Sequence, residues 1–589
     1  MYTDLRRFIQ ELERRGLLVR IKTEVDPNQE ITIIQHRVLA TQGPALLFER
    51  VKGSPYRVVS NLFGTRQRVA LACGEDPWEL GQRLPRILRQ LMPPSMGNLW
   101  RIRRDLLRMV HVRMRRVSRG PVLETVTDPA DLNRLPVLTC WPEDGGPFMT
   151  LPLVHTVDPL TGQGNLGIYR LQRFDASATG MHWQIEKGGG FHFHQATKTG
   201  RALPVSVFLG GPPALIIAAV APLPEGIDER LLAAYLMQKP LSVIRRPLSG
   251  HLIPAACEFV LEGMVEPGDL RREGPFGDHF GHYSEAADYP VFKVQRVLAR
   301  RDAIYPATVV GKPVQEDFYI GEALQALTLP LLRQIKPAIK DLWAYPETGF
   351  HPLAVMAVEE RYPHEALKHV LSMLGEGQLS LTKVMISVKA DVDVRNFMAV
   401  SKSLWRHLKP EGIHLLAPTA QDTLDFTGPA MNTGSRLILI GTGDGQDQER
   451  THLPPLPTSV TEVHLQILEA VAIGPAFLML KISNNCSDVR TLQKLLQRDK
   501  VACQYLFHVL VSEDVPIQDP ILRLWGWFTR FDPAADIYPA GHAVRGNRLL
   551  FEFPILLDAR WKKGYPRPVE FDVAVERQVN DNWASYGIP

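Results

Sequence analysis

The spacing of hydrophobic residues at the start of the chain predicts a helix followed by strands. Apolar residues recur there at intervals of three or four: Leu5, Phe8, Ile9 and Leu12. They share one face of a helix that Thr3 can cap and Gly16 can end. Residues 17–25 and 45–50 are β-prone runs with a helical pattern between them. This alternation predicts an N-terminal α/β domain, which we place at residues 1–118.

Between residues 121 and 302 the pattern changes to short β-prone runs separated by glycine and proline. Examples are residues 167–170, 204–209 and 292–297. Closely spaced short strands are typical of a barrel-like β domain, which we place at residues 119–312.

After Ala303 the α/β alternation returns, and residues 313–589 are predicted to form a C-terminal α/β domain. A faint repeat runs through it at an offset of 123 residues: Asp391-Val392, Trp405 and Pro410 recur as Asp514-Val515, Phe528 and Pro533. The two segments are residues 380–445 and 503–570, with approximate bounds. They are either two copies of one unit or two βα units that came to resemble each other by chance.

Composition narrows the class of protein. The chain has 589 residues, of which 45% are hydrophobic and 22% charged, and this excludes disordered, collagenous and disulfide-scaffold classes. A net charge of +4 over this length gives no electrostatic case for a nucleic-acid partner. Five scattered cysteines without CxxC spacing favour reduced thiols. With no signal peptide at the start and no apolar run long enough to span a bilayer, we expect a soluble, cytoplasmic protein.

Eight arginines lie between residues 101 and 119. They indicate either an anionic partner or membrane surface, or a solvated helix face that leads into a linker. We favour the solvated face, because no interleaved aromatic residues support nucleic-acid binding. Gly120-Pro121 marks a domain boundary after this run.

Two segments of the β region carry candidate ligands. On a regular strand Asn165 and Arg170 face opposite sides, so one could serve a metal or phosphate and the other a substrate. From this segment alone a surface arginine is the favoured interpretation. Glycines 188–190 precede His192 and His194, which would share one face of a strand and are either metal ligands or solvated side chains.

Three acidic residues complete the candidates. Glu258 lies in a run that otherwise looks buried, so it must be neutral, paired or bound to a metal. With Asn165 and His192 it would form a ligand set suited to Mn²⁺ or Mg²⁺. Glu273 and Asp278 flank a Pro/Gly turn; either this is a surface turn, or both pair with Arg170 while the less solvated acid is raised toward neutrality.

Together these segments resemble the UbiD family of prenylated-flavin-dependent decarboxylases. The resemblance rests on the ordered combination of residues 165–170, 181–183, 188–192, 222–226, 260–263 and 273–279. The flanking segments 43–49, 382–383, 424–426 and 583–587 agree with it, so it covers nearly the whole chain.

The resemblance implies an N-terminal α/β domain, a central split β-barrel that binds prenylated FMN, and a C-terminal α/β domain that dimerises. It implies Asn165, His192 and Glu258 as ligands of Mn²⁺ or Mg²⁺, and a K⁺ site at carbonyls of residues 218–221 and the same glutamate. The implied cofactor-binding residues are Tyr169, Arg170, Phe191, His192, Ala219, Val220, Ala221, Pro222, Glu258 and Lys383.

The implied reaction is a reversible non-oxidative decarboxylation in which Arg170, Glu273 and Asp278 are catalytic. Asp278 would donate the proton, Arg170 would orient the substrate carboxylate or the cofactor, and Glu273 would tune Arg170. Position 278 is Asp, whereas other branches of the family carry Glu there. The shorter acid suits a bulky aromatic substrate.

The implied substrate is an aromatic or α,β-unsaturated acid, foremost a 4-hydroxybenzoate with or without a polyprenyl tail, in quinone biosynthesis. Alternatives are a ring carboxylase or decarboxylase of a degradation pathway, or a non-catalytic scaffold of a quinone-synthesis complex. The implied partners are a flavin prenyltransferase that supplies the cofactor and a second copy of the chain in a homodimer or larger homo-oligomer. A prenylated substrate would also place the protein at the inner face of the membrane.

Overall fold

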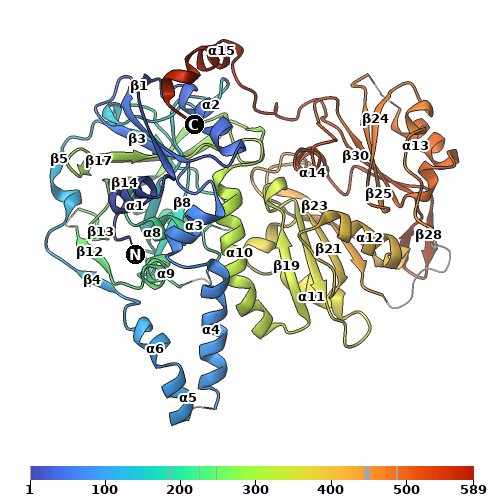
Figure 1. The fold of residues 1–589 in the computed structure, drawn as a ribbon, viewed down its shortest axis with the longest axis horizontal. Coiled ribbons are helices and arrows are strands. Elements are labelled where there is room, and N and C mark those ends of the chain that lie inside the picture. Colours follow the sequence, from blue (N-terminus) through green and yellow to red (C-terminus); the bar gives the residue numbers. More distant parts are fainter. Residues whose placement is uncertain are drawn as a thin grey trace. The chain divides into compact units, whose positions relative to one another are not determined.

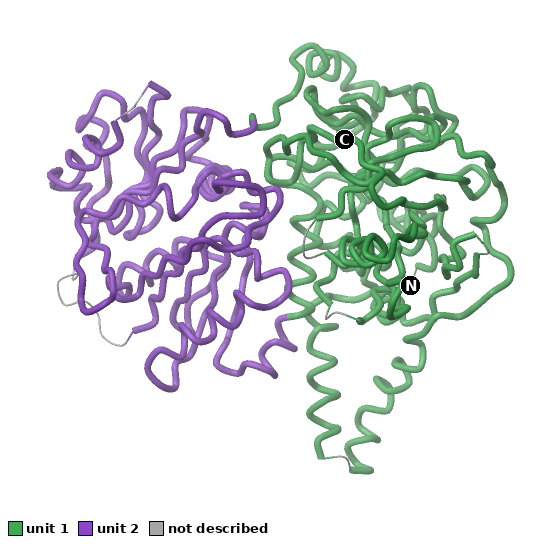
Figure 2. Tube along the Cα trace, turned by 180° about the vertical axis from the view of Figure 1, so that it is seen from behind, with its two compact units in different colours: residues 1–328, 567–589 green, residues 329–566 purple. Residues whose placement is uncertain are grey.

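A computed structural model describes residues 2–589 except 94, 185–186, 224–225, 247, 444–451 and 486–487. It divides into two compact units (Figure 2), unit 1 with residues 1–328 and 567–589 and unit 2 with residues 329–566. In the described part of the chain, no helix has both the length and the apolar character needed to cross a bilayer. The four described cysteines are free thiols: Cys73, Cys140, Cys257 and Cys503.

Unit 1 begins with the predicted helix, α1 (Leu5–Arg14), whose buried residues are the four expected from the pattern. Its cap is Asp4 rather than Thr3, because the Asp4 carboxylate accepts the Arg7 N–H at 2.9 Å. β1 (Leu18–Val25), α2 (Glu30–Ala40), β2 (Ala45–Val51) and β3 (Arg57–Ser60) follow. The sheet order is β1-β2-β3-β18, so β18 (Ile304–Pro306) returns to the N-terminal sheet from far along the chain.

The central region is an antiparallel sheet, as the short β-prone runs predicted, but its strand order does not form a closed barrel, and the split barrel stays a prediction. Its order is β10-β17-β14-β11-β7-β8, with β5 also paired to β17. β8 and β10 lie at opposite edges and do not pair, so the sheet does not close. The strands are β5 (Thr125–Thr127), β7 (Leu153–Val157), β8 (Gly164–Ile168), β10 (Ala178–Gly180), β11 (Leu203–Leu209), β14 (Phe259–Glu273) and β17 (Ala287–Ala299).

Unit 1 contains further helices. They are α3 (Arg66–Cys73), α4 (Pro77–Leu91), α5 (Met96–Arg101), α6 (Arg103–Met109), α7 (Gly188–Lys198), α8 (Pro213–Ala218) and α9 (Glu229–Met237). Of these, α4, α5 and α6 project away from the sheets (Figure 1). Short strands complete unit 1: β4 (Met114–Arg116), β6 (Phe148–Met149), β9 (Leu171–Gln172), β12 (Leu241–Arg245), β13 (Leu252–Pro254), β15 (Phe276–Gly277) and β16 (Tyr283–Ser284). α10 (Glu316–Ile335) runs across the boundary between the units.

Unit 2 contains two five-stranded sheets of the same topology. Their orders are β19-β20-β21-β23-β22 and β24-β25-β26-β30-β27, and in both the outer pairs are antiparallel and the inner pairs parallel. The first comprises β19 (Ile339–Ala344), β20 (Leu353–Val358), β21 (Val384–Lys389), β22 (Ile413–Ala420) and β23 (Thr433–Gly441), with α11 (Glu365–Met373) and α12 (Phe397–His407). The second comprises β24 (Ile467–Ile473), β25 (Phe477–Ile482), β26 (Phe507–Val511), β27 (Ile537–Pro539) and β30 (Ile555–Ala559), with α13 (Val489–Arg498), α14 (Leu522–Phe528) and the hairpin β28 (His542–Arg545) and β29 (Arg548–Phe551).

The two sheets of unit 2 correspond closely along the chain. β26 begins at Phe507, 123 residues after β21 begins at Val384, which is the offset of the repeat in the sequence. One hydrophobic core is built from both halves and includes Val355 and Ile386 of the first and Phe477 and Val509 of the second. Equal topology at a constant offset is the arrangement that an internal duplication produces.

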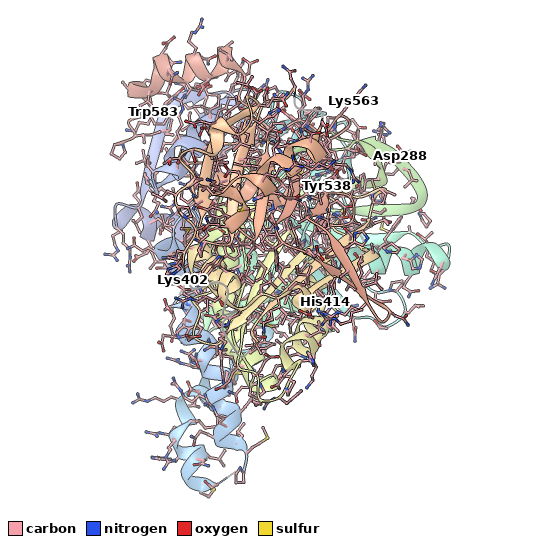
Figure 3. The ribbon with its side chains drawn as sticks, turned by 90° about the vertical axis from the view of Figure 1, so that its right-hand side faces the viewer. Asp288, Lys402, His414, Tyr538, Lys563 and Trp583 are labelled. Carbon is pink, nitrogen blue, oxygen red and sulfur yellow. The ribbon has the colours of Figure 1, made fainter. Side chains whose placement is uncertain are left out.

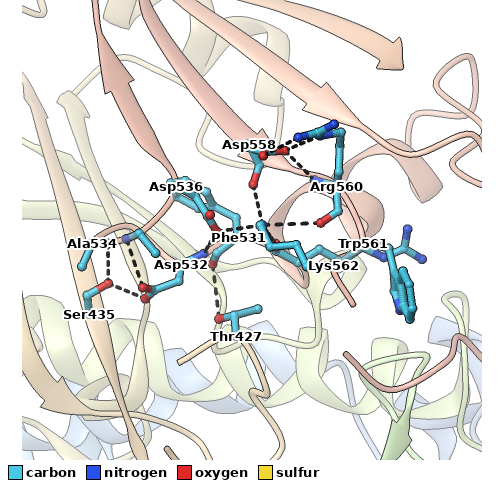
Figure 4. Close-up of polar contacts among 12 residues, drawn as sticks. Thr427, Ser435, Phe531, Asp532, Ala534, Asp536, Asp558, Arg560, Trp561 and Lys562 are labelled. Carbon is cyan, nitrogen blue, oxygen red and sulfur yellow. Dashed lines mark hydrogen bonds and ion pairs between the residues drawn. The ribbon is translucent and has the colours of Figure 1, made fainter. Parts of the chain in front are cut away.

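Polar contacts also join the two halves of unit 2 (Figure 4). Ser435 of β23 donates to Asp532 at 2.5 Å and accepts the Ala534 N–H at 2.8 Å. The same loop continues to Asp536, which accepts from Lys562 at 3.0 Å. Ser435, Asp532 and Asp536 are buried, so their polar atoms bond to protein groups and not to water. The bonds of Ser435 to residues 532 and 534 help to fix the position of the second sheet relative to the first.

The C-terminal segment returns to unit 1. α15 (Val573–Asn582) lies against α2, where Arg37 donates to Asn580 at 2.6 Å and pairs with Glu576 at 3.1 Å. Tyr586 donates to the buried Glu30 at 2.7 Å. The sequence-based division assigned all of residues 313–589 to one domain, whereas residues 313–328 and 567–589 lie in unit 1. Contacts between residues so far apart leave no local pattern in the sequence.

Candidate active site

Arg170 is buried between two carboxylates. It lies between β8 and β9, and its side chain is 6% exposed, so the favoured interpretation as a surface arginine is wrong. Its Nε donates to Glu273 Oε1 at 3.1 Å, and its Nη1 contacts Asp278 Oδ2. The guanidinium also lies over the ring of Phe276, 4.9 Å from the centroid. A buried charge needs such partners, because its desolvation otherwise costs on the order of several kcal/mol.

The two carboxylates come from one turn at the end of β14. Glu273 is the last residue of that strand and is fully buried, and Asp278 follows the short strand β15. Gly180 faces Glu273, and a Cβ at this position would lie 2.3 Å from Glu273 Oε2. The turn is therefore a packed part of the interior, and the surface-turn alternative is wrong.

His182 is a member of this cluster to which the sequence analysis gave no role. Its Nδ1 lies 2.9 Å from Glu273 Oε1, its ring packs on Tyr289 at 4.3 Å, and its Nε2 lies 3.2 Å from the Gln184 amide nitrogen. Burial and the positive charge of Arg170 lower the pKa of His182. A neutral imidazole then donates from Nδ1 to Glu273 and accepts at Nε2 from Gln184. The segment 181–183 was only one part of the family resemblance.

The pKa values of both acids lie below their ordinary range. Burial alone would raise them, but His182 and Arg170 outweigh it at Glu273, and His279 and Arg170 outweigh it at Asp278. His279 contacts Asp278 Oδ1 through both its backbone N–H at 2.7 Å and its Nδ1 at 2.8 Å. Neither acid has the raised pKa that the sequence analysis expected.

Two carboxyls of this region have a raised pKa: Asp144, which accepts the Gly277 N–H at 2.8 Å and whose pKa burial raises to about 7, and Asp317, in the first turn of α10. Burial, with a contribution from the charge of Asp278, raises the pKa of Asp317 to about 6, although His279 lowers it. Asp278, whose pKa is lowered, thus acts electrostatically on Asp317, whose pKa is raised, and acids with pKa values shifted in opposite directions are found at proton-transfer sites.

The depressed pKa values predict how stability depends on pH. A carboxyl whose folded pKa lies below its unfolded value of about 4 stabilises the fold above that pH, and this contribution is lost as the pH falls. We expect the free energy of unfolding of the wild-type protein to fall on acidification below about pH 4. Glu273→Gln and Asp278→Asn proteins should show a shallower fall in urea unfolding at a series of pH values; an unchanged slope would contradict the assignment.

Two buried polar atoms of the cluster have no hydrogen-bond partner among the described residues. They are Arg170 Nη2, a donor, and Glu273 Oε2, an acceptor. An unsatisfied buried polar atom costs about 1–3 kcal/mol, so such atoms indicate a place where a ligand binds. A carboxylate would satisfy the free NH₂ group of the arginine.

Asn165 and His192 lie close together, but His192 is not on a strand as the sequence predicted. His192 lies on helix α7, so the prediction that His192 and His194 share a strand face is wrong; His192 is buried and His194 is exposed. His192 Nδ1 contacts Thr156 Oγ1 at 2.8 Å, and Thr156 is the cross-strand partner of Asn165. Gly188, one turn before His192, lies so close that a Cβ would be 2.1 Å from Asn165 Oδ1.

Glu258 has other partners. Its carboxylate accepts from Arg6 at 3.3 and 3.2 Å and from the Ile304 N–H at 3.0 Å, and Arg300 lies 3.6 Å away. A carboxylate that contacts β8 next to Asn165 in the chain is that of Glu229, the first residue of α9, which accepts the Leu166 N–H at 2.9 Å. Burial raises the pKa of Glu229 to about 7. Sequence reasoning missed Glu229, which lies in a polar, turn-like segment.

No three His, Cys, Asp or Glu side chains gather closely enough to hold a metal ion in the described ranges. A ligand set of one asparagine, one histidine and one glutamate has only two side chains of these four types, so it is compatible with that finding. Asparagine oxygen, imidazole nitrogen and carboxylate suit a hard divalent cation.

The start of α7 suits an anionic group. This 11-residue helix begins with three glycines and its N-cap residue makes no side-chain cap hydrogen bond, and the start of such a helix attracts an anion. The indole Nε1 of Trp183, a buried donor without a hydrogen-bond partner among the described residues, would lie 2.5 Å from a Cβ at Gly189. Tyr169 is buried here too, and its hydroxyl accepts the Gly189 N–H at 3.3 Å. These groups fit the phosphate of a flavin nucleotide.

The other cofactor-binding candidates lie at several places. Ala219, Val220, Ala221 and Pro222 directly follow α8; Ala219 is buried, Ala221 is half-buried, and Val220 and Pro222 are exposed. Phe191 on α7 is 52% exposed. Lys383 is a buried residue of unit 2 that pairs with Asp425 at 2.8 Å. Contact of these residues with a cofactor stays a prediction.

Three family models match the chain. They are the 3-octaprenyl-4-hydroxybenzoate carboxy-lyase N-terminal domain at residues 9–88, the Rift-related domain at 114–313 and the C-terminal domain at 318–441. The second sheet of unit 2 lies beyond these matches.

Relatives match along the whole chain. A protein of Chlamydia muridarum without an assigned function is 41% identical over 99% of both chains. A Chlamydia pneumoniae protein, named as one of the subunits of a 4-hydroxybenzoate decarboxylase, is 38% identical over 99% of this chain and 98% of its own.

Solved structures share the fold. The closed form of vanillic acid decarboxylase from Sedimentibacter hydroxybenzoicus is 26% identical, with a TM-score of 0.67 over 78% of this chain and 98% of its own. The UbiD-class enzyme HmfF from Pelotomaculum thermopropionicum, solved with FMN, is 25% identical, with a TM-score of 0.63 over 78% and 99%. With its three domain matches and its full-length relatives, the chain belongs to the UbiD family of carboxy-lyases.

Proposed function

We propose that the protein decarboxylates an aromatic or α,β-unsaturated carboxylic acid with prenylated FMN as cofactor. The observation that carries the proposal is the buried Arg170, held by Glu273 and Asp278, with Nη2 left without a partner among the described residues. The similarity to a protein named for 4-hydroxybenzoate decarboxylase favours a 4-hydroxybenzoate, with or without a polyprenyl tail, as in quinone biosynthesis.

The nucleotide phosphate would lie at the start of α7, near Trp183 Nε1 and the N–H groups of residues 188–190. Prenylated FMN, when bound, supplies an electron sink for the carbon that loses CO₂. The HmfF structures with FMN and with prenylated FMN support this cofactor, and a flavin prenyltransferase would supply it.

For the divalent metal we propose Asn165, His192 and Glu229, with Glu229 in place of Glu258. Glu229 accepts a hydrogen bond from the residue next to Asn165, whereas Arg6 and Arg300 already neutralise the charge of Glu258. A cation of the Mn²⁺ or Mg²⁺ class would offset the charge of the phosphate, and K⁺ would bind nearby at carbonyls of residues 218–221.

In the proposed reaction Arg170 binds and orients the substrate carboxylate through Nη2. The added negative charge raises the pKa of Asp278, because two carboxylates then share one guanidinium. Asp278, which His279 contacts, then takes up a proton from water and delivers it to the carbon that CO₂ leaves. His182 keeps Glu273 ionised, and Glu273 holds Arg170 in place.

A second candidate is a reversible carboxylase/decarboxylase of aromatic degradation. It is favoured by the similarity to vanillic acid decarboxylase. A non-catalytic scaffold has less support, because the buried Arg170 cluster is complete. A homodimer is our proposal for the assembly, to be checked by light scattering.

The proposed function predicts a specific cofactor and product. We expect protein from cells that also express a flavin prenyltransferase to carry prenylated FMN by mass spectrometry, and to release CO₂ from 4-hydroxybenzoates. Incubation of the phenol product with labelled bicarbonate tests the reverse direction and separates the two candidates. Unmodified or absent flavin in active protein, or no turnover of any aromatic acid by flavin-loaded protein, would contradict the proposal.

A further inference from the structure

An arm of three helices projects from the rest of unit 1 (Figures 1 and 2). We call residues 77–110, with α4, α5 and α6, the arm. α5 and α6 run as one nearly continuous helix, because Ile102 donates to Asn98 at 3.2 Å and accepts from Leu106 at 2.9 Å. The bonds from residue i to i−4 thus continue across the junction.

The arm exposes large apolar side chains that have no core to pack on. Met92, Met96, Trp100, Leu107 and Val110 are each at least 59% exposed. Met96, Trp100, Leu107 and Val110 follow one another at intervals of four, seven and three residues. They therefore share one face of the α5–α6 helix. A surface helix normally turns such a face to the core, and an exposed apolar face marks an interaction site.

The arm is also strongly cationic. Residues 77–110 contain seven arginines and two acids, a larger positive excess than the +4 of the whole chain. The Arg103 guanidinium lies over the Trp100 ring, 4.2 Å from its centroid, within the apolar face. The favoured interpretation from the sequence, a solvated charged face, accounts for the arginines but not for the exposed apolar side chains among them. Figure 3 shows the side chains that project outward from the arm.

We propose that the arm docks on a membrane surface of anionic lipids. Its apolar face would enter the boundary between headgroups and acyl chains, and its arginines would contact lipid phosphates. Nucleic acid is less suitable, since bases stack on aromatic rings and four of the five exposed apolar residues are not aromatic. The inference does not depend on the proposed reaction.

Flotation of the full-length protein with vesicles tests the inference. We expect it to float with phosphatidylcholine vesicles that contain phosphatidylglycerol, more weakly with phosphatidylcholine alone, and less as salt rises. An Arg101→Gln, Arg103→Gln, Arg104→Gln protein should partition about 100-fold less, since each arginine near the surface adds about a factor of five. A Met96→Ser, Trp100→Ser, Leu107→Ser protein should lose about tenfold or more.

The matched control removes the same charge from exposed arginines elsewhere, in an Arg201→Gln, Arg490→Gln, Arg577→Gln protein, which should float like wild type. Circular dichroism checks the fold of each variant. Absence of wild-type flotation, or equal loss in the control, would overturn the inference. So would wild-type self-association that the serine variant abolishes without any vesicle binding, because the face would then pair two copies of this chain.

Discussion

An Arg170→Gln protein is expected to lose about three orders of magnitude in kcat/KM for CO₂ release. The substitution removes the NH₂ group proposed to bind the substrate carboxylate and leaves Glu273 and Asp278 without their shared cation. Removal of one preorganised donor in a buried site costs about 10²–10³ in rate, and loss of the charge adds to this. Arg170→Lys keeps the charge but not the two-pronged geometry, so we expect an intermediate loss.

Arg173→Gln is the matched control, because this half-buried arginine lies three residues further along and donates to the Leu132 carbonyl. Its activity should stay near that of wild type. Flavin content, measured by absorbance, separates loss of chemistry from loss of cofactor. Wild-type kcat/KM in flavin-loaded Arg170→Gln and Arg170→Lys proteins would exclude the proposed role.

Glu229→Gln and Glu258→Gln are expected to fail in different ways. Glu229→Gln should lose bound Mn²⁺, since a neutral amide is a poor replacement for a charged ligand. Glu258→Gln should keep the metal but lower the free energy of unfolding by about 3–5 kcal/mol, because it leaves Arg6 and Arg300 buried in part without their counter-charge.

Elemental analysis of the purified proteins and urea unfolding measure the two effects separately. A Glu258→Gln protein that is stable but free of metal would restore Glu258 to the ligand set and remove Glu229 from it. Glu262→Gln is a further control, since this buried carboxylate pairs with Arg246 and Arg296 and should affect stability alone.

Local patterns predicted much of the secondary structure. The apolar spacing of residues 5–12 predicted α1, and the runs at 17–25 and 204–209 predicted β1 and β11 within a residue at each end. The pattern failed at residues 188–194, where alternating Phe and His side chains imitate a strand but the segment is helix α7. Contacts of α7 with β7, β8 and β14 override that local alternation.

The sequence by itself determined the order of α/β and β regions along the chain, the family resemblance and the residue types of the catalytic cluster. Only the tertiary structure decided which groups meet: Arg170 with carboxylates 103 and 108 residues away, Glu258 with Arg6 across 252 residues, and His182 with Glu273. A carboxylate looks the same in the sequence whether it meets an arginine or a metal. Its partner is set by how distant segments pack, and that packing fixes its burial, its charge state and its chemistry.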